Sequence, residues 1–147
     1  MNFTSQICTT KEQSERLLAL GLNGETADMH FYHHTEIDNT KTWEPSVISY
    51  GNVMHAAYMY DESYIKDYIT PAWSLHRLIE MMPTYIDVIG DEWTLNVLQG
   101  KLIAYTTDEN ENFLFAQGAV SLYDSIIAAI EWLIQAGHFN KEYLNDL

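Results

Sequence analysis

Residues 121–137 carry a complete helix signal near the C-terminal end of the chain. Ser121-Leu122-Tyr123-Asp124 is a Ser-x-x-Asp helix start, and Gly137 stands where a left-handed C-terminal cap is favoured. The apolar residues between them fall at helical spacing: Leu122, Ile126, Ile127, Ile130, Leu133 and Ile134. An isolated helix with such a face is unstable in water, so we expect it to lie against a sheet.

Three segments in the second half of the chain predict that sheet. Residues 93–97 alternate between apolar and polar side chains, a glycine turn follows, and residues 102–107 return along the first segment. The acidic stretch 108–112 separates them from a third strand at 113–116. Together they predict an antiparallel meander with one packed face and one face exposed to water.

Capping patterns predict two shorter helices. Thr10 and Gln13 form a capping box that starts a helix over 11–20. Ser74 caps a second helix, whose apolar side chains continue at helical spacing to Met82. The proline that follows ends it, because a residue before proline avoids helical angles.

The fold class that these elements predict is α+β: a small antiparallel meander packed against a long C-terminal amphipathic helix, with two shorter helices. The remaining segments are a strand at 29–35, a loop at 36–45, extended segments at 47–50 and 53–60 about a Gly-Asn turn, a charged connection at 61–69 and a last helical turn at 141–144. The length is typical of one domain, and no repeat or linker interrupts it, so we expect a single domain over 1–147.

The charge of the chain narrows the kinds of partner that it can have. Its 21 Asp and Glu residues exceed seven Lys and Arg residues, which gives a formal net charge of −14. Such a protein repels nucleic acid and anionic lipid and attracts cationic surfaces. We therefore expect a protein partner with a basic surface, and neither nucleic acid nor a membrane. Because 47% of the residues are hydrophobic, disorder is disfavoured despite the charge.

The sequence also predicts a location. Cys8 is the single cysteine, so no disulfide can form within the chain. The first residues lack the basic and apolar regions of a secretory signal, and no apolar run is long enough to span a bilayer. We expect a cytoplasmic protein.

Three of the six histidines lie close together, as His30, His33 and His34. On a strand, His30 and His34 share a face, and with a nearby carboxylate they could bind a transition metal. The alternative is that all three are ordinary strand residues that titrate near neutral pH. The three residues are our metal-ligand candidates, and the sequence predicts no other cofactor.

Tyrosine and tryptophan are dense between residues 43 and 73. Aromatic rings with polar tips are enriched at protein–protein interfaces, whereas rings that stack on bases accompany a basic groove that this acidic region lacks. The alternative is that several rings fill the core. The candidate interface residues are Tyr50, Tyr58, Tyr60, Tyr64, Tyr68 and Trp73.

No motif in the chain fixes a chemical reaction. The neighbouring acids, such as Asp61-Glu62, are typical of solvated turns and do not indicate two carboxylates across a cleft. Cys8 has no base beside it in the sequence, and there is neither a Gly-x-Ser-x-Gly elbow nor a phosphate-binding glycine loop. We assign no catalytic residue and favour a protein that is not an enzyme.

Three stretches of the chain, taken together, resemble a known group of proteins. They read TKEQSERLLALGL at 10–22 with TADM at 26–29, ITPAWSL from 69 to the Met-Pro at 82–83, and the 126–137 helix with Trp132. In order and spacing they resemble small acidic proteins of gut Bacteroidetes that are often encoded in phage-like or other mobile elements. That family has no assigned activity, so the resemblance implies a mobile-element accessory protein and carries over no functional residue.

The favoured hypothesis is therefore an acidic accessory protein of phage or mobile-element type that binds another protein. Binding could use the aromatic segment as an ordinary interface, or the carboxylates could imitate a phosphate backbone and occupy a DNA-binding enzyme such as a Cas-type nuclease. The alternatives are a metal-dependent protein built on the histidine cluster and a structural subunit of a homo-oligomer.

Overall fold

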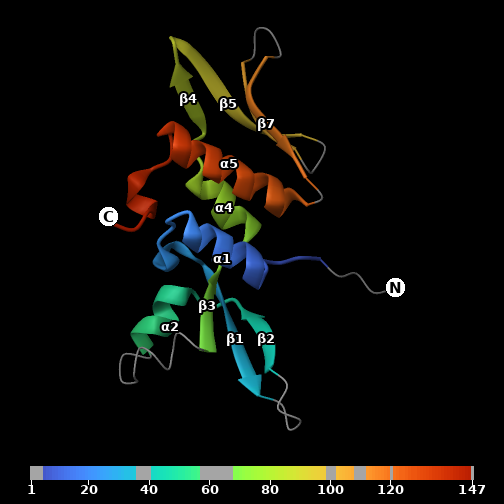
Figure 1. The fold of residues 1–147 in the computed structure, drawn as a ribbon, viewed down its shortest axis with the longest axis vertical. Helices are drawn as coiled ribbons and strands as arrows, with labels where there is room; N and C mark the ends of the chain where they lie inside the picture. Colours follow the sequence, from blue (N-terminus) through green and yellow to red (C-terminus); the bar gives the residue numbers. More distant parts are fainter. Residues whose placement is uncertain are drawn as a thin grey trace. The chain divides into compact units, whose positions relative to one another are not determined.

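The computed structural model describes residues 5–35, 41–56, 68–98, 102–107, 112–119 and 121–146. The fold is α+β, with one three-stranded and one four-stranded antiparallel sheet (Figure 1). The chain divides into two compact units, which are described separately below. The first, which we call unit 1, comprises Met1–Arg77 and Tyr143–Leu147, and the second, unit 2, comprises Leu78–Glu142. The single domain expected from the length stays a prediction.

Unit 1 is built on the three-stranded sheet. Its strands are β1 (Met29–Thr35), β2 (Lys41–Ser46) and β3 (Ile69–Ala72), in the order β2-β1-β3. The other elements are α1 (Lys11–Ala19), the short 3-10 helix η1 (Gly24–Thr26) and α2 (Tyr50–Ala56). Helix α1 contacts β3, and α2 contacts both η1 and β3. The 29–35 strand is therefore confirmed, as the central strand of this sheet.

The capping box that predicted α1 is present. Thr10 Oγ1 accepts a hydrogen bond from the Gln13 backbone N–H at 3.1 Å, and Gln13 Oε1 accepts one from the Thr10 N–H at 3.0 Å. The helix ends at Ala19, one residue before the predicted end, and buries Leu17 completely. Gly21 then takes a φ of 103°, which glycine adopts without steric cost.

Two predictions in unit 1 are wrong. The loop expected at 36–45 contains β2, an edge strand that depends on pairing with β1 and tolerates Pro45 because an edge strand has a free side. Extended segments were expected at 47–50 and 53–60; instead residues 47–49 form a bend and α2 covers 50–56. Ser49 starts that helix: its Oγ accepts a hydrogen bond from the Asn52 N–H at 3.2 Å, and its carbonyl accepts one from the Val53 N–H at 3.1 Å. Residues 57–67 lie outside the described residues.

Unit 2 confirms the predicted meander and extends it by one strand. The strands are β4 (Tyr85–Val88), β5 (Asp91–Leu98), β6 (Leu102–Thr106) and β7 (Phe113–Gly118), paired in sequence order. The predicted strands correspond to β5, β6 and β7. The additional strand, β4, forms a hairpin with β5. Helix α4 (Leu75–Met81), the predicted proline-bounded helix, leads into this unit.

The C-terminal helix α5 (Leu122–Ala136) packs against β6 and β7, as the sequence predicted (Figure 1). Ser121 Oγ accepts a hydrogen bond from the Asp124 N–H at 3.2 Å, and Gly137 has the left-handed φ of 79° expected of the cap. The Trp132 ring stacks on Phe115 of β7, with ring centroids 4.7 Å apart. The buried core of the helix consists of Tyr123, Ser125, Ile126, Ile127, Ala129, Ile130 and Leu133.

Apolar burial is the main force that holds α5 on the sheet. Complete burial of one isoleucine side chain stabilises a fold by about 1.5–3 kcal/mol, and Ile126, Ile127 and Ile130 are all completely buried. The opposite face of the sheet is polar in its middle, where Asn96 Nδ2 donates a hydrogen bond to Thr106 Oγ1 at 2.6 Å. After α5, the predicted last turn is present as a 3-10 helix, η3 (Lys141–Tyr143).

Candidate functional site

The structure describes the side chains of two of the three candidate metal ligands, His30 and His33, and it places them apart. His30 and His33 are 5% and 8% exposed, and because they are three residues apart on β1 they point to opposite faces of the sheet. The side chain of His34 lies outside the described residues, so the pair His30 and His34 stays a prediction. Among the side chains that the structure describes, no three His, Cys, Asp or Glu residues are grouped to hold a metal ion.

In the β1 cluster, the two histidines whose side chains are described, His30 and His33, each have a structural role. His30 Nδ1 lies 2.7 Å from the Ile48 carbonyl oxygen, and since a carbonyl only accepts, Nδ1 carries the hydrogen and donates it. This bond ties β1 to the connection between β2 and α2. The His33 ring stacks on Tyr68 and meets the edge of Trp43, with ring centroids 4.5 Å apart in both pairs.

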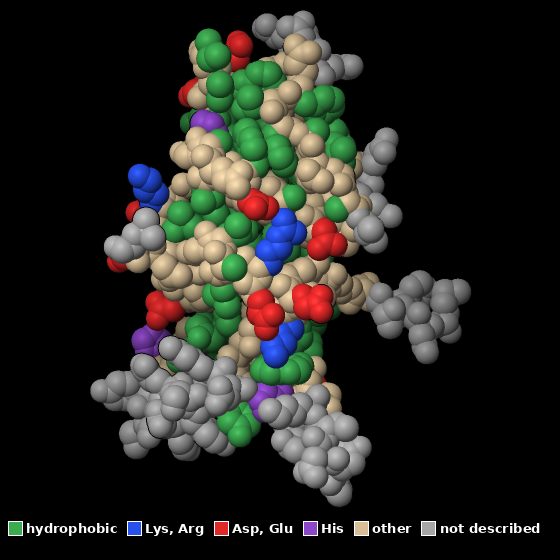
Figure 2. All heavy atoms as spheres, in the orientation of Figure 1, with side chains coloured by type: hydrophobic (Ala, Val, Ile, Leu, Met, Phe, Trp, Pro, Cys, Tyr) green, Lys and Arg blue, Asp and Glu red, His purple; other side chains and the backbone are tan. Residues whose placement is uncertain are grey.

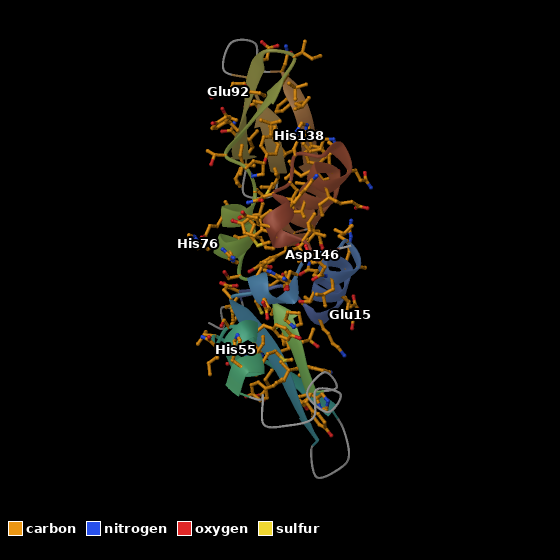
Figure 3. All side chains as sticks on the ribbon, turned by 90° about the vertical axis from the view of Figure 1, so that its left-hand side faces the viewer. Glu15, His55, His76, Glu92, His138 and Asp146 are labelled. Carbon is orange, nitrogen blue, oxygen red and sulfur yellow. The ribbon has the colours of Figure 1, made fainter. Side chains whose placement is uncertain are left out.

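The other three histidines lie on separate elements. Figure 3 shows His55 on α2 and His76 on α4, and His138 follows α5. His138 packs against Trp132, with ring centroids 5.9 Å apart. None of these positions adds a described histidine to the β1 cluster.

The candidate interface tyrosines and tryptophan do not form one described surface. The half-buried Tyr50 starts α2, and its ring lies so close to Gly24 that a Cβ there would be 3.2 Å from Tyr50 Cε1. Tyr68 stacks on His33. Tyr58, Tyr60 and Tyr64 lie outside the described residues.

Trp73 is a core residue, which is the alternative that the sequence left open for this cluster. Its side chain is completely buried, and its Nε1–H donates a hydrogen bond to Thr26 Oγ1 at 3.0 Å. Its backbone N–H donates to Thr9 Oγ1 at 3.1 Å, and its carbonyl accepts from the Thr9 N–H at 2.8 Å. A ring held in this way is unavailable to a partner.

The carboxylate beside the histidine cluster also has a structural role. Asp28 Oδ1 accepts a hydrogen bond from the Ser74 backbone N–H at 2.9 Å, and Oδ2 accepts one from the Ser74 hydroxyl. Ser74 in turn caps α4 through the Arg77 N–H, and Arg77 Nε donates to the Thr26 carbonyl at 2.8 Å. Asp28, one of the acids that flank the histidine cluster in the sequence, thus fixes the start of α4.

Cys8 has no features of a nucleophile in this structure. It is 4% exposed and packs with Met29 and Ala72. Burial, and secondly the negative charge of Asp28, raise the pKa of the Cys8 thiol to about 11. At neutral pH the side chain is therefore the protonated thiol, whereas catalysis requires the thiolate.

The carboxylates of the part of the chain that the structure describes are exposed or half-buried. None of its Asp or Glu residues is buried: the buried polar residues are Thr9, Ser14, His30, His33 and Ser125. On the face drawn in Figure 2, acidic side chains reach the surface at several places. The described part of the chain thus carries the surface charge expected from the composition.

One exposed apolar feature was not found from the sequence. Ile89, in the turn between β4 and β5, is 98% exposed and has a φ of 54°, the single positive value among the described residues other than glycine. The signal that could have found it is the Ile-Gly pair between two short alternating segments. Isoleucine is a poor turn residue, so the pair lacks the residue signal by which a two-residue hairpin turn is normally found.

Neither family models nor curated proteins nor solved structures contain a match to this chain. The resemblance to mobile-element proteins therefore stays an expectation. Within the described residues, none of the helices has the length and apolar character needed to cross a bilayer.

Proposed function

We propose that this chain is a non-enzymatic accessory protein that acts by binding another protein with a basic surface. The observation that carries the proposal is the outward position of the described carboxylates, in a chain of net charge −14. A surface of this sign attracts Lys- and Arg-rich surfaces over roughly the Debye length, which is about 10 Å at 0.1 M salt.

The chemistry of the described residues favours binding over catalysis. The Cys8 thiol is buried and protonated, the Asp28 carboxylate is engaged with Ser74, and His30 and His33 point to opposite faces of β1. Cys8, Asp28, His30 and His33 are thus each held by their own structural neighbours. The resemblance to mobile-element proteins also supports an accessory role.

The test is capture of proteins from the organism that encodes the chain, with the untagged protein immobilised through its amines. Bound proteins are eluted with salt rising from about 0.05 to about 0.5 M, over which the Debye length falls several-fold. We expect the bound proteins to have basic surfaces and to elute within this range. Bound proteins of acidic or neutral surface, retained at high salt, would contradict the proposal.

The same titration separates the two modes of binding. If the acids imitate a phosphate backbone, duplex DNA competes for the captured protein and the affinity falls steeply with salt. If an ordinary interface is used, DNA does not compete. A homo-oligomeric role is tested on the same preparation by light scattering, which gives the mass of the free protein.

A further inference from the structure

The turn of the β4–β5 hairpin places an apolar side chain at a strained and fully solvated position. Val88 pairs with Asp91, so Ile89 and Gly90 are the two residues of the turn, and both have positive φ, at 54° and 80°. This is the pattern of a type I′ turn, which is normally filled by Asn-Gly, Asp-Gly or Gly-Gly. A β-branched residue with positive φ is a true outlier, because its side chain crowds the backbone there.

Folding gains nothing from this isoleucine. Its side chain is 98% exposed, so it buries almost no apolar surface in return for the unfavourable backbone. Asparagine or glycine would form the same turn without the conflict. Strained residues of this kind cluster at functional positions, where the side chain is needed for another reason.

The hairpin surrounds Ile89 with negative charge. Asp87, Asp91 and Glu92 are all exposed, and Glu92 pairs with Asp87 across the hairpin. Figure 3 labels Glu92 on this hairpin. The chain from Leu78 to Leu98 contains no Lys, Arg or His, so no cation of the hairpin itself neutralises these carboxylates.

An exposed aromatic side chain lies on the same side of the hairpin. Tyr85 is 56% exposed and is two residues before Asp87 on β4, so the two share a face. Tyr85 therefore adds an exposed aromatic ring to the face of the hairpin that carries Asp87, and tyrosine is enriched at protein interfaces.

We infer that the β4–β5 hairpin is the docking element of this protein, with Ile89 inserted into an apolar pocket of a partner protein and the pocket rim carrying Lys or Arg. The inference rests on the proposed function and names the surface that performs it. Ile89 supplies the apolar contact, and Asp87, Asp91 and Glu92 pair with the cationic rim.

The charges select this partner over the other occupants. A second copy docked hairpin to hairpin would bring the same three carboxylates against their own kind, which is repulsive. Nucleic acid and anionic lipid are repelled in the same way. A purely apolar pocket would remove the carboxylates from water without pairing them, which is costly.

The first experiment identifies what Ile89 touches. The full chain carrying Ile89→p-benzoylphenylalanine is irradiated in a lysate of the organism that encodes it, and Val47→p-benzoylphenylalanine serves as the control. Val47 is also exposed, at 81%, but has an ordinary φ and lies in unit 1. We expect crosslinks from position 89 alone to a basic protein, at apolar residues with Lys or Arg beside them.

The second experiment measures the affinity of the partner that the crosslinks identify. The partner is purified separately and titrated against the wild-type chain and its variants, none of which carries the photo-crosslinker. We expect Ile89→Asn to weaken binding by about tenfold or more, and Ile89→Val and Val47→Asn to remain within about twofold of wild type. Because Ile89→Asn relieves the turn, it should melt no lower than wild type, so that a loss of binding cannot come from unfolding.

A third experiment tests the charges with the double variant Asp91→Asn, Glu92→Gln. Its control is the double variant Glu12→Gln, Glu15→Gln on α1, which has the same net charge. All four residues are exposed. We expect the hairpin pair to flatten the salt dependence of binding more than the α1 pair does.

The outcomes separate the two proposals. If wild type and Ile89→Asn bind the same basic partner equally, the hairpin inference is wrong and the proposed function stands. If the crosslinks from position 89 join two copies of the chain or reach an acidic surface, the inference is likewise overturned. If wild type binds no basic protein in the salt titration, the proposed function itself fails.

Discussion

Replacement of Ile89 by Asn should make this protein more stable, although it removes a large apolar side chain. A left-handed backbone costs an ordinary L-residue roughly 1–2 kcal/mol, and Asn adopts it with a smaller penalty because its side chain hydrogen-bonds locally. The side chain is 98% exposed, so no burial is lost. We therefore expect a gain of about 1 kcal/mol in the free energy of unfolding.

The assay is thermal unfolding followed by circular dichroism, supported by urea titration. A gain of about 1 kcal/mol raises Tm by about 2–4 °C if the whole chain unfolds together, and by about 4–8 °C if unit 2 unfolds alone. The size of the shift thus also tests the predicted single domain. Val47→Asn is the matched control: it makes the same change of polarity at an exposed site with ordinary φ, and should leave Tm unchanged. An Ile89→Asn protein that melts at or below wild type would refute the argument from strain.

Three further predictions concern unit 1. The Cys8 thiol should resist Ellman's reagent in the native state at about pH 8 and react after unfolding; equal reactivity in both states would contradict its burial. Because burial raises its pKa from 9.0 to about 11, its contribution to stability should persist below pH 9.0 and be lost as the pH rises towards about 11. Trp73→Phe should lower the free energy of unfolding in urea by about 1–3 kcal/mol, through lost volume and the lost bond to Thr26, and a half-buried control, Trp43→Phe, should cost less. Zinc should not shift the melting curve, since His30 is buried and bonded to Ile48; a stoichiometric shift that His30→Asn removes would show that the metal prediction was right.

The elements that the sequence predicted well are those whose signals are local. Ser121 and Gly137 bound α5, and Thr10 with Gln13 starts α1, because a cap forms between residues only a few positions apart. The apolar spacing of α5 also required a sheet to cover it, and the meander supplied one.

The errors arose where partners distant in sequence decide the structure. Strand β2 has little pattern of its own and exists through its pairing with β1. At α2 the Gly51-Asn52 pair suggested a turn between two extended segments, whereas the Ser49 cap and contacts with β3 make the segment helical.

The candidate site was predicted less well than the fold. The predicted strand at 29–35 already placed His30 and His33 on opposite faces. The hydrogen bond from His30 to Ile48 could not be predicted, because it joins residues 18 positions apart. Trp73 could not be assigned to core or interface without knowing that Thr9 and Thr26 surround it. Ile89 was missed because its importance lies in breaking a turn preference.

The two outer strands of the unit 2 sheet differ in how they resist addition of a foreign strand. Strand β4 is four residues long and carries Asp87, and short charged edges discourage such pairing. Strand β7 is longer, and its sequence, Phe-Leu-Phe-Ala-Gln-Gly, contains neither charge nor proline. Asp108, Glu109 and Glu111 directly precede it, in the position of gatekeeper residues that suppress amyloid-like stacking. Of the two edges of this sheet, β7 is therefore the one that relies on charges outside the strand itself to discourage pairing with a foreign strand.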